Sequence, residues 1–134
     1  MVSLIVMEQG SEWPGHVGDS DDVVATGSSS ETLLAKIQLV FLALRRRNQQ
    51  VRVAVLACNA ATDAESAARR AAVARELLGL VATVGCGRLV LSAAERSSTQ
   101  LRRELLSLVG VLSDGLRGSS ATLWLRFGSE SRKA

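Results

Sequence analysis

Apolar residues along the chain form two kinds of pattern, namely short runs and longer stripes with helical spacing. The runs cover residues 2–7, 51–59, 88–92 and 121–127. The run at 51–59 is apolar at nearly every position, which is typical of a strand buried on both faces in a parallel sheet. The run at 121–127 alternates instead, with Leu123, Leu125 and Phe127 on one side and Thr122, Trp124 and Arg126 on the other. We predict four strands, with 51–59 at the centre of the fold.

Three stripes of apolar residues, spaced three and four positions apart, separate these runs and predict three amphipathic helices. Each stripe follows a capping-box spacing, in which a Ser or Thr and a Glu or Gln three positions later satisfy free backbone N–H groups. The three spacings are Ser28-x-x-Glu31, Thr62-x-x-Glu65 and Ser97-x-x-Gln100. We expect the helices to begin there and to end near Arg47, Gly85 and Gly118.

The alternation of strands and helices predicts an α/β fold, a small three-layer α/β/α sandwich with four mostly parallel strands in the order β-α-β-α-β-α-β. Such a domain would be a Rossmann-like or flavodoxin-like half. Because the first two strands look apolar on both faces, we expect the spatial order 2-1-3-4, with the first helix alone on one face. We expect one domain over 1–128, a long flexible loop at 10–30 rich in Gly, Ser and Asp, and a polar tail at 129–134.

Charge is distributed unevenly along the chain. The net charge is +3, but residues 1–35 hold six acidic side chains and no Lys or Arg, so the remaining residues carry +9. This separation indicates an acidic loop folding over a basic rim, or a basic surface for an anionic partner. Two cysteines and one histidine argue against a metal centre, and we expect no cofactor. Without a signal peptide or a long apolar span, we expect a cytoplasmic protein that has no membrane segment.

The carboxyl ends of parallel strands predict where a ligand would bind. Turn-forming and polar residues follow three of the predicted strands, and they form our candidate ligand-binding set. The set is Glu8, Gln9, Gly10, Asn59, Glu95, Arg96, Ser97 and Ser98. Four arginines, Arg69, Arg70, Arg102 and Arg103, lie in or just beyond the first turns of the second and third helices, where the helix dipole disfavours cations. We expect ordinary solvated arginines there, and contact with the acidic loop, a phosphate or an acidic partner is the alternative.

The polar side of the last strand predicts a homodimer interface formed by Thr122, Trp124 and Arg126, because the expected helices leave that surface bare. The arginine triplet at 45–47 has no aromatic stacking platform beside it, so we do not expect nucleic-acid binding. The function we expect is a non-catalytic interaction or regulatory module, dimeric and able to contact a protein partner.

Two alternatives stay open. The element order and size resemble universal stress proteins, and that resemblance implies a small-molecule or nucleotide-binding domain, although the glycine-rich nucleotide motif of that family is missing here. The strand end Val55-Leu56-Ala57-Cys58-Asn59 is similar to the Ala-Cys strand end of caspase-like cysteine peptidases. That second resemblance implies Cys58 as the nucleophile and His16 as its base.

Overall fold

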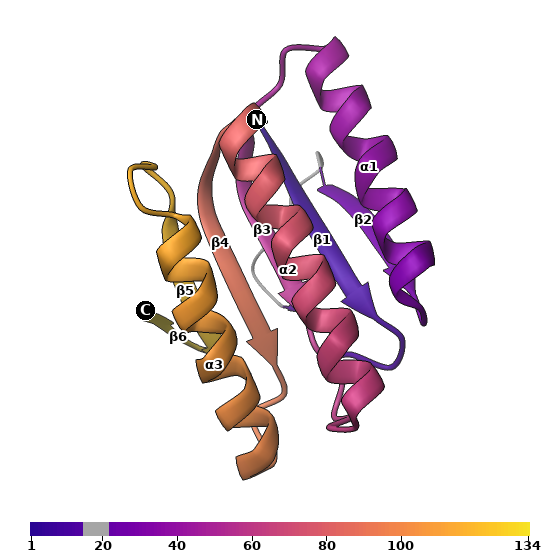
Figure 1. The fold of residues 1–134 in the computed structure, drawn as a ribbon, viewed down its shortest axis with the longest axis vertical. Helices are drawn as coiled ribbons and strands as arrows, with labels where there is room; N and C mark the ends of the chain where they lie inside the picture. The colour runs from indigo at the N-terminus through magenta and orange to yellow at the C-terminus, as the bar shows by residue number, and fades with distance from the viewer. Residues whose placement is uncertain (15–21) are drawn as a thin grey trace.

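The computed structural model describes residues 1–14 and 22–134 and contains one six-stranded sheet with three helices (Figure 1). The elements are β1 (Val2–Glu8), β2 (Asp22–Gly27), α1 (Ser30–Arg46), β3 (Val51–Ala57), α2 (Ala64–Val84), β4 (Cys86–Ala93), α3 (Thr99–Gly115), β5 (Thr122–Phe127) and β6 (Glu130–Lys133). All neighbouring strands are parallel except β5 and β6, which are antiparallel. The predicted α/β class with a mostly parallel sheet is confirmed.

Two strands lie in segments that we had predicted to be irregular. β2 falls inside the predicted loop at 10–30, and β6 forms from the predicted polar tail at 129–134. β6 has no apolar residue and is exposed along its whole length, so hydrophobic patterning carries no signal for it. It forms because Gly128, with φ of +62°, reverses the chain and brings β6 beside β5.

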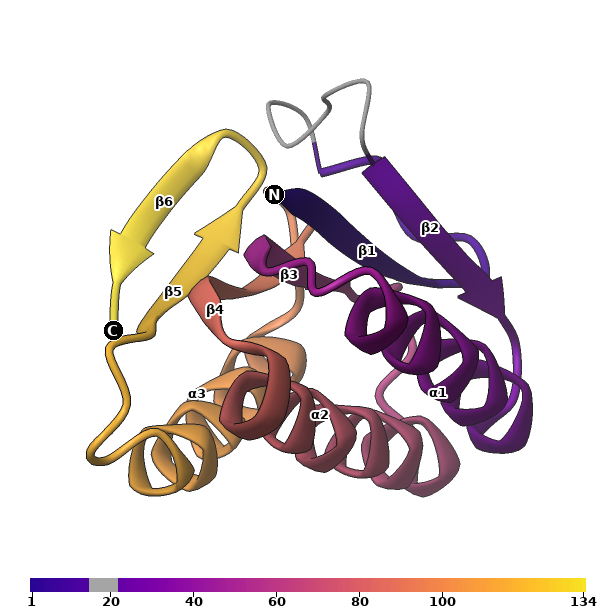
Figure 2. The same cartoon turned by 90° about the horizontal axis from the view of Figure 1, so that it is seen from above.

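The strand order is β2-β1-β3-β4-β5-β6. The four predicted strands are β1, β3, β4 and β5 of the structure, so the predicted order 2-1-3-4 corresponds to β3-β1-β4-β5. The structure has β1-β3-β4-β5 instead, and the predicted order is therefore wrong. Each of the three β-α-β units steps across the sheet in the same direction. Because such crossovers are right-handed, all three helices lie on the same face of the sheet (Figure 2). The expectation that the first helix lies alone on the opposite face is therefore wrong, and in the described residues that face carries no helix.

The helices begin one residue later than the capping-box spacings predict. The N-cap residues are Ser29, Asp63 and Ser98, and each side chain accepts a hydrogen bond from the backbone N–H three residues later. Capping therefore operates at all three starts, but without the reciprocal bond of a capping box. α2 ends at Gly85, whose φ of +89° is the conformation that glycine adopts most readily.

The centre of β3 is buried on both faces, as the sequence predicts. Ala54, Val55 and Leu56 all have no exposed surface. On one face Ala54 and Leu56 join the main hydrophobic core with helix residues such as Val73 and Leu77. On the other face Val55 and its register partner Ile5 on β1 also have no exposed surface, although no helix of the described residues lies over that face (Figure 2). The sheet thus has one face for packing and one that opens to solvent toward β5.

Candidate functional site

The carboxyl ends of β1 and β3 meet around the buried carboxylate of Glu8, which is 2% exposed. Its Oε1 accepts a hydrogen bond from the backbone N–H of Asn59 at 2.9 Å and another from Nε of Arg70 at 2.8 Å. Its Oε2 accepts from Nε of Arg69 at 2.6 Å. Both oxygens are therefore bound by donors of this chain, and two of those donors are charged.

Arg70 is the most fully satisfied member of this cluster and has no exposed surface. Besides Glu8, its Nη1 donates to both carboxylate oxygens of Glu104, at 2.9 and 3.1 Å. Its Nη2 donates to the backbone carbonyl and the side-chain oxygen of Asn59, at 3.1 and 2.9 Å. All three nitrogens of this guanidinium thus donate hydrogen bonds, and two carboxylates balance its charge. That arrangement makes a buried charge tolerable.

The edge where we predicted a ligand is therefore filled by side chains of the chain itself. Of the predicted ligand-binding residues, Glu8, Gln9 and Asn59 do come together, since the Asn59 side-chain amide donates to the carbonyl of Gln9 at 2.9 Å. Arg69 and Arg70, the cations that an anion at this edge would contact, both donate to Glu8 instead. We call Glu8, Asn59, Arg69, Arg70 and Glu104 the buried ion cluster.

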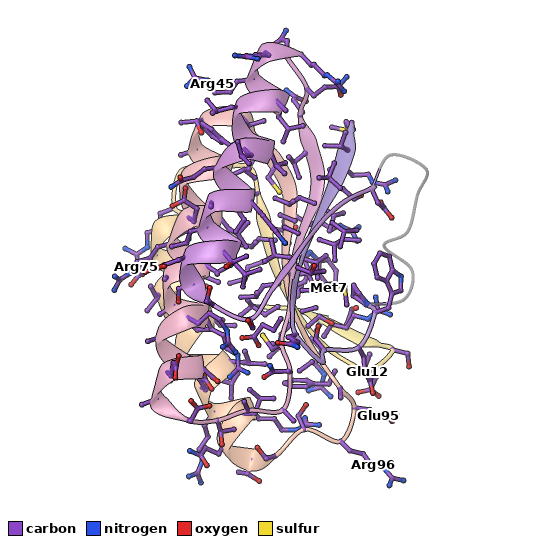
Figure 3. All side chains as sticks on the ribbon, turned by 90° about the vertical axis from the view of Figure 1, so that its right-hand side faces the viewer. Met7, Glu12, Arg45, Arg75, Glu95 and Arg96 are labelled. Atoms are coloured by element: carbon purple, nitrogen blue, oxygen red, sulfur yellow. The ribbon has the colours of Figure 1, made fainter. Side chains whose placement is uncertain are left out.

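The other predicted ligand-binding residues lie outside this cluster. Gly10 is exposed in the turn after β1, with φ of +78°. Glu95 and Arg96 are exposed in the loop after β4, and Figure 3 shows Arg96 pointing away from the molecule. Ser98 caps α3, and the hydroxyl of Ser97 donates to the carbonyl of Ala94. These two serines therefore have local structural roles.

The peptidase alternative depends on a reactive thiol at Cys58. This residue is 3% exposed, and burial, assisted by the nearby charge of Glu8, raises the pKa of its thiol to about 12. A thiol with such a pKa is almost entirely protonated near neutral pH and is a poor nucleophile. His16, the expected base, lies outside the described residues.

A second candidate surface lies on the face of the sheet that carries no helix. A groove of about 490 Å³ there is lined by Arg52, Val53, Arg88, Val90, Trp124, Arg126, Ser129 and Ser131. We call it the helix-free groove. Trp124 and Arg126, two of the three predicted interface residues, line it, and the third, Thr122, accepts a hydrogen bond from the Trp124 indole at 2.9 Å.

Its charged side chains are held in place by specific contacts. The guanidinium carbon of Arg88 lies 5.0 Å from the centre of the Trp124 ring, a cation–π contact. Arg126 is 9% exposed, and its Nε donates to the carbonyl of Gly128 at 2.7 Å. Arg52 donates to the hydroxyl of Ser3 at 3.2 Å. The groove is thus a positively charged surface with one aromatic ring, and no acidic residue is among those that line it.

Comparisons with known protein families, with curated proteins and with solved structures find no significant match to this chain. Within residues 1–14 and 22–134, no group of three or more His, Cys, Asp or Glu side chains is arranged to hold a metal ion. None of the three helices has the length and apolar character needed to cross a membrane.

Proposed function

We propose that this chain is a non-catalytic interaction module and that the helix-free groove is its contact surface for an acidic, extended segment of a protein partner. The observation that carries the proposal is the pair Arg88 and Trp124, an exposed cation over a half-buried aromatic ring, on a sheet face that carries no helix in the described residues. Arginine and tryptophan are the residues that most often dominate the energy of protein interfaces. The filled strand-end edge supports the non-catalytic part of the proposal.

The charge of the groove favours an acidic partner. Arg88 and Arg126 lie on neighbouring strands, and the register pairs Arg88 with Thr122, four positions before Arg126 on β5. Carboxylates of an extended segment, which project every second residue, match that spacing. A single-stranded nucleic acid is the less favoured partner, because Trp124 is the only aromatic residue in the groove lining and Arg88 already lies over its ring.

The test is fluorescence anisotropy at 50 mM salt with a labelled ten-residue peptide of alternating Glu and Val. A peptide of alternating Lys and Val and a ten-nucleotide single-stranded DNA serve as controls. We expect the acidic peptide to bind at least tenfold more tightly than either control. Arg88→Glu should weaken its binding at least tenfold, because that change removes the cation over Trp124 and adds a like charge.

The matched control is Arg75→Glu, which makes the same change of charge elsewhere. Arg75 is exposed on α2, and Figure 3 shows it projecting from the helical layer on the side away from Met7. We expect wild-type affinity for this variant. Equal losses in the two variants would mean that the peptide responds only to net charge, and that result contradicts the proposal, as does preferential binding of the DNA.

A homodimer through Thr122, Trp124 and Arg126 stays a separate prediction. A two-fold interface brings the same patch of both copies together, so two positively charged surfaces would face each other. Sedimentation velocity of the wild type and of Trp124→Ala measures this directly. A dimer that Trp124→Ala dissociates would assign the groove to a second copy and would replace the acidic segment as its occupant.

A further inference from the structure

We propose that a second groove, between α3 and the β5–β6 hairpin, receives an amphipathic helix with an acidic polar face from a protein partner. This groove measures about 410 Å³ and lies on the helical side of the sheet, since three residues of α3 line it. It is distinct from the helix-free groove, so the inference goes beyond the function proposed above.

The helical layer ends before the sheet does. α2 packs between α1 and α3, whereas α3 has a helical neighbour on one flank only. β6 extends the sheet one strand beyond β5, and no helix of the described chain follows α3 (Figures 1 and 2). A helix lying beside α3 under the hairpin would continue the layer with the same kind of packing.

The surfaces on both sides of this position are apolar. Leu106 and Val109 of α3 are spaced three positions apart and line the groove, and Leu106 is 58% exposed. Leu125 and Phe127 of β5 form its other wall and are half-buried. These four residues give both walls of the groove an apolar lining. An amphipathic helix covers such a lining with apolar residues spaced three and four positions apart.

Charges at the rim determine what the polar face of the incoming helix should carry. Arg102, Arg132 and Lys133 line the groove, against one acidic residue, Glu130. The guanidinium carbon of Arg102 lies 4.1 Å from the centre of the Phe127 ring, and its Nη2 donates to the carbonyl of Glu95 at 2.8 Å. Arg102 is therefore held at the rim before any partner arrives, and the excess of cations favours carboxylates on the partner.

The same charges argue against a second copy of this chain as the occupant. A two-fold pairing across the groove would bring α3 against α3. The rim of one copy, with its excess of cations, would then lie against the same cationic rim of the other copy. The partner that fits is thus a different protein, which contributes a helix with leucine-type residues on one face and Glu or Asp on the other.

The test measures binding of a labelled 18-residue helical peptide with Leu on one face and Glu on the other, by anisotropy at 50 mM salt. The controls are a peptide with Lys in place of Glu and a scrambled Leu/Glu peptide of the same composition. We expect saturable binding of the Leu/Glu helix, at least tenfold weaker binding of both controls, and a loss of affinity when salt rises to 300 mM.

Leu106→Glu should weaken that binding at least tenfold, whereas Val111→Glu should leave it unchanged. Both residues are exposed on α3, at 58% and 53%, but Val111 does not line the groove, so the pair introduces the same charge on the same helix. Arg132→Glu, on the hairpin, is a second variant and should also weaken binding, with a smaller salt dependence than the wild type.

Several results would overturn the inference. These are the absence of saturable binding, equal binding of the Leu/Glu and Leu/Lys helices, and an equal loss in Leu106→Glu and Val111→Glu. A dimer of the wild type that Leu106→Glu dissociates would assign the groove to a second copy instead. The two proposals fail separately, because Arg88→Glu should not affect the helical peptide and Leu106→Glu should not affect the extended one.

Discussion

Replacing Glu8 by Gln tests whether the buried ion cluster stabilises the fold as its geometry indicates. The substitution keeps the size of the side chain and removes a negative charge that contacts both Arg69 and Arg70. Arg69, with a side chain 10% exposed, still donates to the carbonyl of Ser28 at 3.2 Å. Arg70 has no exposure and keeps only Glu104 as a charged partner, so most of the cost should come from Arg70.

Removing one partner of a buried ion pair costs about 3–5 kcal/mol, because the other charge stays desolvated. Domains of this size have a total free energy of unfolding of about 5–15 kcal/mol, so Glu8→Gln should use up a large part of it. With a urea m-value of about 2 kcal/mol/M, a loss of about 4 kcal/mol lowers the midpoint by about 2 M. Urea titrations at pH 7, followed by far-UV circular dichroism, measure this shift.

Two further variants keep the experiment interpretable. Glu12→Gln neutralises an exposed carboxylate and should change the free energy of unfolding by no more than about 0.5 kcal/mol. Glu8→Gln combined with Arg70→Met removes both charges, so it should lose less stability than the sum of the two single variants, with a coupling of about 1–3 kcal/mol. A loss of stability below about 1 kcal/mol for Glu8→Gln would show that the charges of the cluster are not desolvated. Strictly additive losses in the double variant would show that Glu8 and Arg70 do not depend on each other.

Other predictions concern single residues. Because burial raises the pKa of the Cys58 thiol to about 12, mass spectrometry should find it unlabelled by iodoacetamide at pH 8 in the native protein and labelled in urea. The unfolded thiol ionises first, near pH 9, so its contribution to stability should be complete below pH 9 and be lost as pH rises toward 12. Gly128→Ala should cost more in urea titrations than Gly118→Ala. Both positions have positive φ, so each substitution should cost about 1–2 kcal/mol, but only at Gly128 would the new Cβ meet Glu95, at 2.8 Å. A hydrogen bond from Ser66 lowers the pKa of the Asp63 carboxyl, which caps α2. The stabilisation that the Asp63 carboxylate gives to α2 should therefore be complete above pH 4 and be lost as pH falls through that lowered pKa. Asp63→Asn should remove this contribution to the pH dependence of stability in urea titrations between pH 2 and 5.

Sequence patterning predicts the elements that carry an apolar stripe or run and misses the two strands that do not, although Val23 of β2 packs against the core. The three helices and β1, β3, β4 and β5 have apolar stripes or runs, and all are confirmed within a few residues. β6 is entirely polar and β2 is a short apolar stretch among Gly, Ser and Asp, so neither has a pattern distinct from a loop. The strand order was mispredicted because apolar residues on the second face of β1 and β3 suggested a helix, whereas that face is buried without one in the described residues.

The candidate site was predicted in part, for a related reason. Topology identifies which strand ends meet, and that places Glu8 beside Asn59 before any coordinates are known. The helix dipole does not explain Arg69 and Arg70 near the start of α2, but the sequence favours solvated arginines there, so their burial against Glu8 was not predicted. Sequence alone does not identify the carboxylate, because Glu8 lies 61 and 62 positions away. Glu104, 34 positions beyond Arg70, gives no separate signal among the charged residues of α3.

The small-molecule alternative depends on whether that cluster opens. Glu8 contacts Arg69 and Arg70 at 2.6 and 2.8 Å, so an anion that binds these arginines has to displace the Glu8 carboxylate. The displaced carboxylate would then stay buried without a counter-charge. Such an exchange replaces a satisfied pair by a desolvated charge and is unfavourable. We therefore expect that 1 mM ATP will not raise the melting temperature of the protein. A rise that persists both in Arg88→Glu and in Arg132→Glu, and so comes from neither cationic groove, would indicate that the strand-end edge admits ligands after all.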